Sequence, residues 1–99
     1  MAGKTIVWSD HAKYEFRRIL EYYTERNGTP VYSMKLLNQT EELLTTLSKN
    51  PLLGRLTTNR QTRVIPFKDY LIFYEVKNKE ILILSFWDNR QDEDQLKIK

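Results

Sequence analysis

The sequence has no cysteine, and His11 is the only histidine among its 99 residues. Without cysteine there is no disulfide, no thiolate-bound zinc, no iron–sulfur cluster and no thiol catalysis. A histidine-rich metal site is also unexpected, so we expect neither a metal nor a cofactor. A lack of cysteine is typical of cytoplasmic proteins, and we expect this protein in the cytoplasm.

Glycine and proline are scarce as well, with three residues of each. Such a composition argues against a disordered or low-complexity chain. No apolar run approaches the roughly 18 residues that cross a membrane, and the first residues lack the apolar core of a signal peptide. A chain of 99 residues can bury a core of its own, and we expect one domain over residues 1–99.

The net charge is only +3, but the positive charge is concentrated in one stretch. Residues 51–68 contain no acid and four cationic residues, a local charge of +4: Arg55, Arg60, Arg63 and Lys68. One interpretation is a solvated loop and strand edge. The other is a patch that contacts phosphates or an acidic partner.

A short β-prone run at residues 5–8 leads into the first expected helix. Ser9 is a good N-cap for this helix, and the apolar residues that follow recur at three- and four-residue spacings on one face. Asn27 and Gly28 end the helix, because glycine readily takes the left-handed conformation found after a helix C-terminus.

A second helix is expected to begin at once. Thr29 is its expected N-cap, Pro30 its first helical residue, and Pro51 after Asn50 stops it. Its expected buried stripe consists of Leu37, Leu44 and Leu47, supported by Met34, Leu36 and Leu43. Two helices joined by so short a connection fold back as an antiparallel hairpin.

The rest of the chain changes to the two-residue period of strands. Residues 52–61 have the composition of a loop, and a strand is expected from Arg63 onward. Pro66 within this strand indicates a sheet edge or a bulge, because proline cannot donate to the ladder. Lys68 and Asp69 then turn the chain.

Two longer strands follow, at residues 70–76 and 81–87. In the turn between them, at residues 77–79, Asn78 is a good candidate for positive φ. The last strand is apolar almost throughout, which favours an inner strand covered on both faces. The polar tail after it is expected to hold a short helix from Asp92.

The expected element order is β-α-α-β-β-β, which predicts a small α+β domain. In such a domain the apolar stripe of the helix hairpin packs on one face of an antiparallel sheet.

The chain resembles the RelE/ParE superfamily of bacterial toxins from type II toxin–antitoxin modules, over residues 5–92. The resemblance begins with residues 6–9 running into the first helix, and it includes residues 50–55 (NPLLGR). It is most specific at residues 70–76 (YLIFYEV), then a short turn and a hydrophobic strand that ends at residues 88–92 (DNRQD).

The resemblance implies a four-stranded antiparallel sheet packed against the helix hairpin. It also implies a growth-inhibiting toxin of a plasmid-stabilisation system, silenced by a cognate antitoxin whose flexible segment wraps the toxin. The target differs within the superfamily, because RelE-like members cut mRNA on the ribosome and ParE-like members block DNA gyrase. A shared fold does not choose between these targets.

Cleavage of RNA through the 2′-hydroxyl needs a base, an acid and cations that neutralise the phosphate. The ribonuclease branch carries an Arg directly after the aromatic residue that opens its third strand; here Tyr70 is similar to that aromatic residue, and Leu71 follows it. Thr62 and Val64 occupy positions where that branch often has Lys, and Arg63 between them should face the other way. These departures favour the ParE branch, whose members inhibit gyrase without catalysis of their own.

Two alternatives stay open beside the gyrase inhibitor. One is a RelE-like ribosome-dependent mRNA endoribonuclease with Arg63, Tyr70 and Arg90 as candidate catalytic residues. The other is a toxin fold that has lost toxicity and only binds its antitoxin. In each case the residues expected to contact the target or the antitoxin are Arg55, Arg60, Arg63, Trp87 and Arg90.

Individual candidates also have more than one interpretation. Trp87 can stack on a base, anchor a partner or belong to the core. Arg90 either contacts phosphate or a partner, or forms a surface ion pair with a nearby aspartate. His11 is expected on the surface, and the acids at residues 92–94 suit a helix start better than a metal site.

Overall fold

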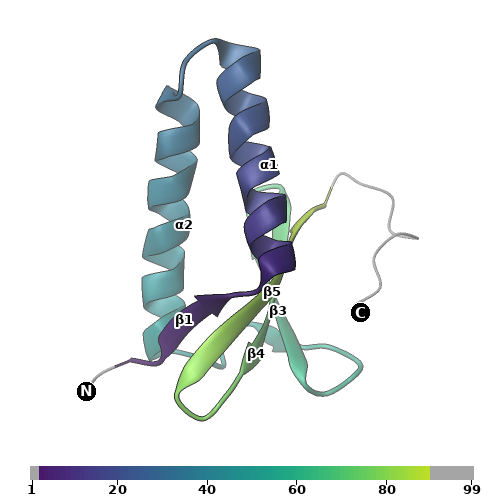
Figure 1. Cartoon of the computed structure of the whole chain (residues 1–99). Helices are drawn as coiled ribbons and strands as arrows, with labels where there is room; N and C mark the ends of the chain where they lie inside the picture. The colour runs from purple at the N-terminus through teal and green to yellow at the C-terminus, as the bar shows by residue number, and fades with distance from the viewer. Residues whose placement is uncertain (1–2, 90–99) are drawn as a thin grey trace.

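The computed structural model describes residues 3–89. The elements follow in the order β1 (Thr5–Trp8), α1 (Asp10–Asn27), α2 (Val31–Lys49), β2 (Arg55–Leu56), β3 (Thr62–Phe67), β4 (Tyr70–Val76) and β5 (Glu80–Asp88). The two helices form an antiparallel hairpin whose lower half packs on one face of the sheet (Figure 1). The expected tail helix from Asp92 lies outside the described residues.

Both ends of α1 have the caps that the sequence predicts. The side chain of Ser9 accepts a hydrogen bond from the Ala12 amide at 3.0 Å. At the other end Gly28 has φ 70°, and its N–H donates to the Thr24 carbonyl at 3.0 Å. These contacts satisfy backbone groups that a helix leaves unpaired at its termini.

The start of α2 differs from the expectation by one residue. Pro30 is the N-cap and Val31 the first helical residue, and no side chain caps this end. Thr29, the expected N-cap, accepts only a long 3.4 Å bond from the Val31 amide.

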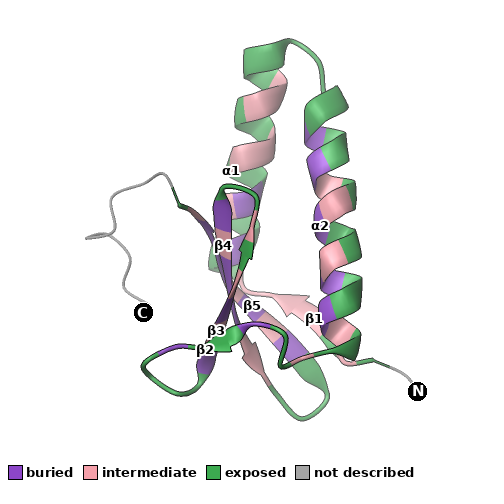
Figure 2. Ribbon diagram, turned by 180° about the vertical axis from the view of Figure 1, so that it is seen from behind, coloured by how far each residue is buried: buried purple, intermediate pink, exposed green. Residues whose placement is uncertain are grey.

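The expected buried stripe of α2 is confirmed at Leu36, Leu44 and Leu47 and is wrong at Met34. Leu36 and Leu47 are fully buried and Leu44 nearly so, whereas the Met34 side chain is 59% exposed. Met34 lies between the buried residues Ser33 and Leu36, so it is on the outer side of α2, whose first turns are largely exposed in Figure 2.

The sheet has five strands in the order β1-β5-β4-β3-β2 and is mixed. The expected four-stranded antiparallel sheet is therefore wrong in two respects. β1 runs parallel to β5, with Thr5 opposite Glu80 and Trp8 opposite Ile83. A parallel pair needs a long crossover, and here the helix hairpin and three strands supply it. β2 was expected as loop because two residues are too few to form an alternating pattern.

The turns before and after β4 lie where the sequence predicts them, but the residues with positive φ are not the expected ones. The backbone N–H of Lys77 donates to the Glu80 carbonyl at 2.8 Å and closes the expected hairpin. Asn78 does not have positive φ; in the described chain the non-glycine residues with positive φ are Arg60 and Lys68. Pro66 pairs with β4 on one side and lies beyond β2 on the other, at the predicted sheet edge.

The main core fills the space between the helix hairpin and the sheet. Its buried members are Ala12, Phe16, Leu36, Leu44, Leu47, Tyr70, Ile72, Tyr74, Ile81, Ile83 and Phe86. An aromatic stack runs through it, with ring centroids 5.3 Å apart for Trp8 and Phe16 and 4.7 Å apart for Phe16 and Phe86.

A second cluster lies on the opposite face of the sheet. It contains Val64, Phe73 and Trp87, each nearly or fully buried. Phe73 stands between two residues of the main core in β4, so successive side chains are buried on alternate faces. This two-sided burial explains the nearly continuous apolar run of β5, which is an inner strand as predicted.

Neither helix within residues 3–89 is long and apolar enough to cross a membrane.

Replacing Leu47 by Ala should lower the free energy of unfolding by about 2–5 kcal/mol, because a fully buried side chain is removed and leaves a cavity. Chemical denaturation measures the change. Met34→Ala, on the exposed part of the same helix, is the matched control and should change stability by no more than about 0.5 kcal/mol. Equal effects of the two substitutions would contradict the assigned stripe.

Candidate functional site

The residues predicted to form a site are separated by the structure into exposed and buried groups. Arg55 and Arg60 are exposed, at β2 and in the β2–β3 loop. Tyr70 and Trp87 are buried, Tyr70 in the main core and Trp87 in the second cluster. Arg90 lies outside the described residues.

Arg63 has a structural contact. It stands opposite Tyr74 across the β3–β4 ladder, on the face that carries the main core, as the alternation argument predicts. Its guanidinium donates a hydrogen bond to the Gly54 carbonyl at 2.7 Å. A cation that was a candidate for catalysis therefore fixes the backbone of the segment between α2 and β2.

The hydroxyl of Tyr74 fixes the same segment from the neighbouring strand. It accepts a hydrogen bond from the Gly54 amide at 2.8 Å and donates one to the Pro51 carbonyl at 2.9 Å. Burial raises the pKa of Tyr74, although the bond from Gly54 and the charge of Arg63 act in the opposite direction. The hydroxyl thus keeps the proton that it donates to Pro51.

Gly54 is required at this position. A Cβ on this residue would lie 2.8 Å from both the Tyr74 hydroxyl and the Val64 carbonyl, and the carbonyl belongs to a strand that cannot move aside easily. We call the hydrogen bonds from Tyr74 and Arg63 to Gly54 and Pro51 the Gly54 clamp. Tyr74 was not singled out from the sequence, where its one signal is a polar hydroxyl in a strand of buried apolar residues.

The clamp holds a segment whose large apolar side chains point into solvent. Leu52 is 67% exposed, Leu53 52% and Leu56 44%. We call these three leucines, together with Arg55 and Arg60, the β2 edge. The arginines were predicted here, whereas the exposure of the leucines was not.

Arg60 also belongs to a well-bonded loop. Its backbone N–H donates to the Thr57 carbonyl at 3.0 Å. The Asn59 side-chain oxygen accepts from the amides of Gln61 and Thr62, each at 2.8 Å. The loop conformation, with positive φ at Arg60, therefore has bonds that support it.

The positions where the ribonuclease branch carries cations are occupied by packing residues. Thr62 and Val64 are almost fully buried, and the Thr62 hydroxyl accepts from the Asn59 amide nitrogen at 2.9 Å. Leu71 is partly buried against the second cluster. Within residues 3–89, acidic and histidine side chains do not gather into any group of three that could hold a metal.

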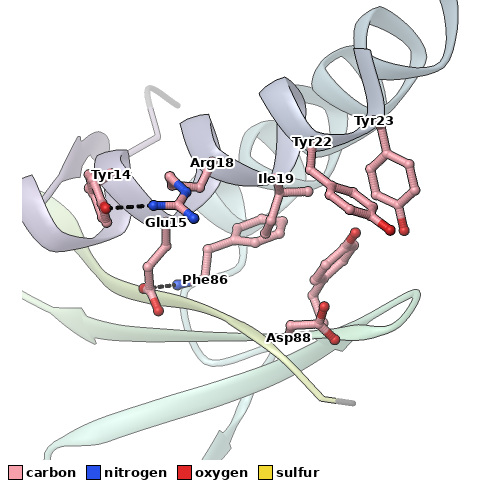
Figure 3. A pocket seen from close by; sticks show the side chains of 9 residues that line it. Tyr14, Glu15, Arg18, Ile19, Tyr22, Tyr23, Phe86 and Asp88 are labelled. Carbon is pink, nitrogen blue, oxygen red and sulfur yellow. Dashed lines mark hydrogen bonds between the residues drawn. The ribbon is translucent and has the colours of Figure 1, made fainter. Parts of the chain in front are cut away.

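A hollow of about 520 Å³ lies between α1 and the end of β5, and Figure 3 shows it. Tyr14, Arg18 and Tyr22 line it from α1, and Arg26 continues their four-residue spacing along the helix. The guanidinium of Arg18 donates to the Tyr14 hydroxyl at 2.9 Å, and that of Arg26 donates to the Tyr22 hydroxyl at 3.1 Å. We call them the tyrosine–arginine row.

Glu15 attaches α1 to β5 at one end of this hollow. Its carboxylate accepts from the Phe86 amide and from the Ser85 hydroxyl, each at 2.9 Å. His11 approaches the same oxygen at 3.3 Å and is exposed, as predicted. These contacts bond the part of β5 that lies beyond the end of β1, where β1 no longer pairs with it. Their role is structural.

Comparison with known proteins identifies a family. The family model described as the ParE toxin of the type II toxin–antitoxin system parDE matches residues 6–93. A solved structure, the chromosomal ParDE TA system from P. aeruginosa, has a similar fold, with a TM-score of 0.73 at 22% identity. The match covers 86% of this chain and 95% of that chain. No curated protein gives a significant match.

Replacing Tyr74 by Phe should lower the free energy of unfolding by about 1–3 kcal/mol, because the buried Gly54 amide loses its hydrogen-bond acceptor. Urea denaturation of both proteins measures the loss. Tyr14→Phe removes an exposed hydroxyl and should stay within about 0.5 kcal/mol of the parent chain. If both variants were as stable as the parent, the clamp would have no energetic role.

Proposed function

The chain belongs to the ParE toxin family of type II toxin–antitoxin parDE systems, and from this membership we propose that it arrests growth by binding DNA gyrase, with no chemical step of its own. Gyrase works on chromosomal DNA, so the proposed action takes place in the cytoplasm. The cognate ParD antitoxin is the partner that neutralises the toxin.

This proposal rests on the residues found in the sheet at the positions where the ribonuclease branch carries cations. Thr62 and Val64 are buried, and Leu71 partly so, at positions similar to those where ribonuclease-type members carry an Arg or often a Lys. Arg63 is bonded to the Gly54 carbonyl. A phosphorane-like transition state needs preorganised positive charge, and loss of one such donor typically costs about 100- to 1000-fold in rate. The sheet favours an inhibitor that acts by binding over a nuclease.

The exposed residues also favour a protein target. Leu52, Leu53 and Leu56 stand beside the exposed Arg55 on the β2 edge. Phosphate contacts would use the arginines but leave the leucines in water, whereas a protein surface can cover both.

For ParD we propose a separate contact, in the hollow bordered by the tyrosine–arginine row. Tyr and Arg are the residue types that most often carry binding energy at protein interfaces. Tyr14 and Tyr22 are more than half exposed, and each is held by an arginine of the next turn, which lowers the entropy lost on binding.

The test of the proposed target uses purified toxin in two assays. We expect inhibition of gyrase supercoiling and no cleavage of mRNA on translating ribosomes. Heat-inactivated toxin, and toxin saturated with ParD, are the controls for non-specific effects. Prompt cleavage within codons without any effect on supercoiling would reverse the assignment in favour of the ribonuclease.

Arg18→Glu should weaken ParD binding by about tenfold or more, because it reverses a charge and removes the support of Tyr14. Lys35→Glu, the same charge change on the exposed side of α2, should leave the affinity within about twofold. Isothermal titration with ParD measures both. Equal losses would assign the effect to net charge and not to the hollow.

A further inference from the structure

We propose that this toxin binds gyrase through the β2 edge. The matching site on gyrase is then a cleft with apolar walls and an acidic rim. This assignment rests on the gyrase inhibition proposed above. It concerns a different part of the molecule from the hollow assigned to ParD.

Rigid support distinguishes the β2 edge from other exposed apolar residues. Val31 and Met34 are as exposed as Leu52 and Leu53, but they lie at the far end of the helix hairpin, where α2 has no side-chain cap. The leucines flank Gly54, whose N–H and carbonyl are both bonded to side chains of other strands. A preorganised apolar segment loses little conformational freedom when a partner covers it.

The two faces of the edge determine the shape of the partner. Leu56 stands opposite Arg63 on the helix-side face, and Arg55 stands opposite Val64 on the other face. A partner that contacts both Leu56 and Arg55 has to reach around β2, the outermost strand of the sheet. A cleft satisfies this condition, and a flat surface does not.

Charge determines the rim of that cleft. Residues 51–68 contain no acid, so Arg55 and Arg60 have no carboxylate within their own segment. The acid of β4, Glu75, is paired with Lys77, whose Nζ lies 2.8 Å from the Glu75 Oε1. The edge is therefore cationic around an apolar centre, and acidic side chains on gyrase would complement it and speed association.

The experiment compares two double variants of the full-length toxin in a gyrase supercoiling assay. Leu52→Ser with Leu53→Ser should raise the toxin concentration needed for half-inhibition by about tenfold or more. Its affinity for ParD should stay within about twofold, and its melting temperature within about 4 °C, because both side chains are more than half exposed. Val31→Ser with Met34→Ser, the matched control, should inhibit like the parent chain.

A second pair tests the rim without changing any apolar residue. Arg55→Ala with Arg60→Ala should raise the half-inhibition concentration by about three- to tenfold at low salt, and the difference should shrink as ionic strength rises. This pair decides the outcome if the serine variant proves unstable.

The outcomes separate the two proposals. Failure of the parent toxin to inhibit gyrase would overturn the proposed function and this assignment together. A parent that inhibits, with both the leucine and the arginine variants equally potent, would overturn the assignment alone. Loss of ParD binding with intact inhibition would assign the β2 edge to the antitoxin, and equal losses in the Val31 and Met34 control would place the contact elsewhere.

Discussion

The buried hydroxyl of Tyr74 is the constraint on which the cationic edge of the sheet depends. A phenol that loses its water on folding has to find partners within the protein. Here the partners are the Gly54 amide and the Pro51 carbonyl. Because both follow α2 directly, their attachment to β4 returns the chain from the helix hairpin to the sheet. The place of β2, and the outward direction of the leucines beside Gly54, follow from this attachment.

The helices could be predicted from the sequence because their signals are local. Ser9 and Gly28 cap α1 through contacts within one turn, and the apolar period of α2 correctly predicted the burial of Leu36, Leu44 and Leu47. The sheet could be predicted only in part, because strand pairing is decided by distant residues. Nothing in residues 5–8 indicates that they pair with β5 in parallel, and the two residues of β2 are held by the clamp rather than by any pattern of their own.

In the candidate site, the sequence located the charges but not their use. Arg55 and Arg63 have the same chemistry and lie in the same basic stretch, yet one is exposed and the other bonds the Gly54 carbonyl. Only the ladder register, which sets Arg63 opposite Tyr74, distinguishes them. The tyrosine–arginine row did have a readable signal in its four-residue spacing. The sequence alone also shows that Leu71, and not an arginine, follows Tyr70. No tertiary structure is needed to see that this cation is absent.

The pairing of the first strand with the last also affects how the toxin is made. The helix hairpin and the hairpins of β2 to β4 join neighbouring segments, so they can form while the chain is still being translated. β1 has no such neighbour: its partners are Glu80 to Ile83, near the other end of the chain. The nascent protein therefore holds an unfinished sheet until β5 has left the ribosome. Toxicity that depends on the folded sheet has to wait for β5 to be made and paired.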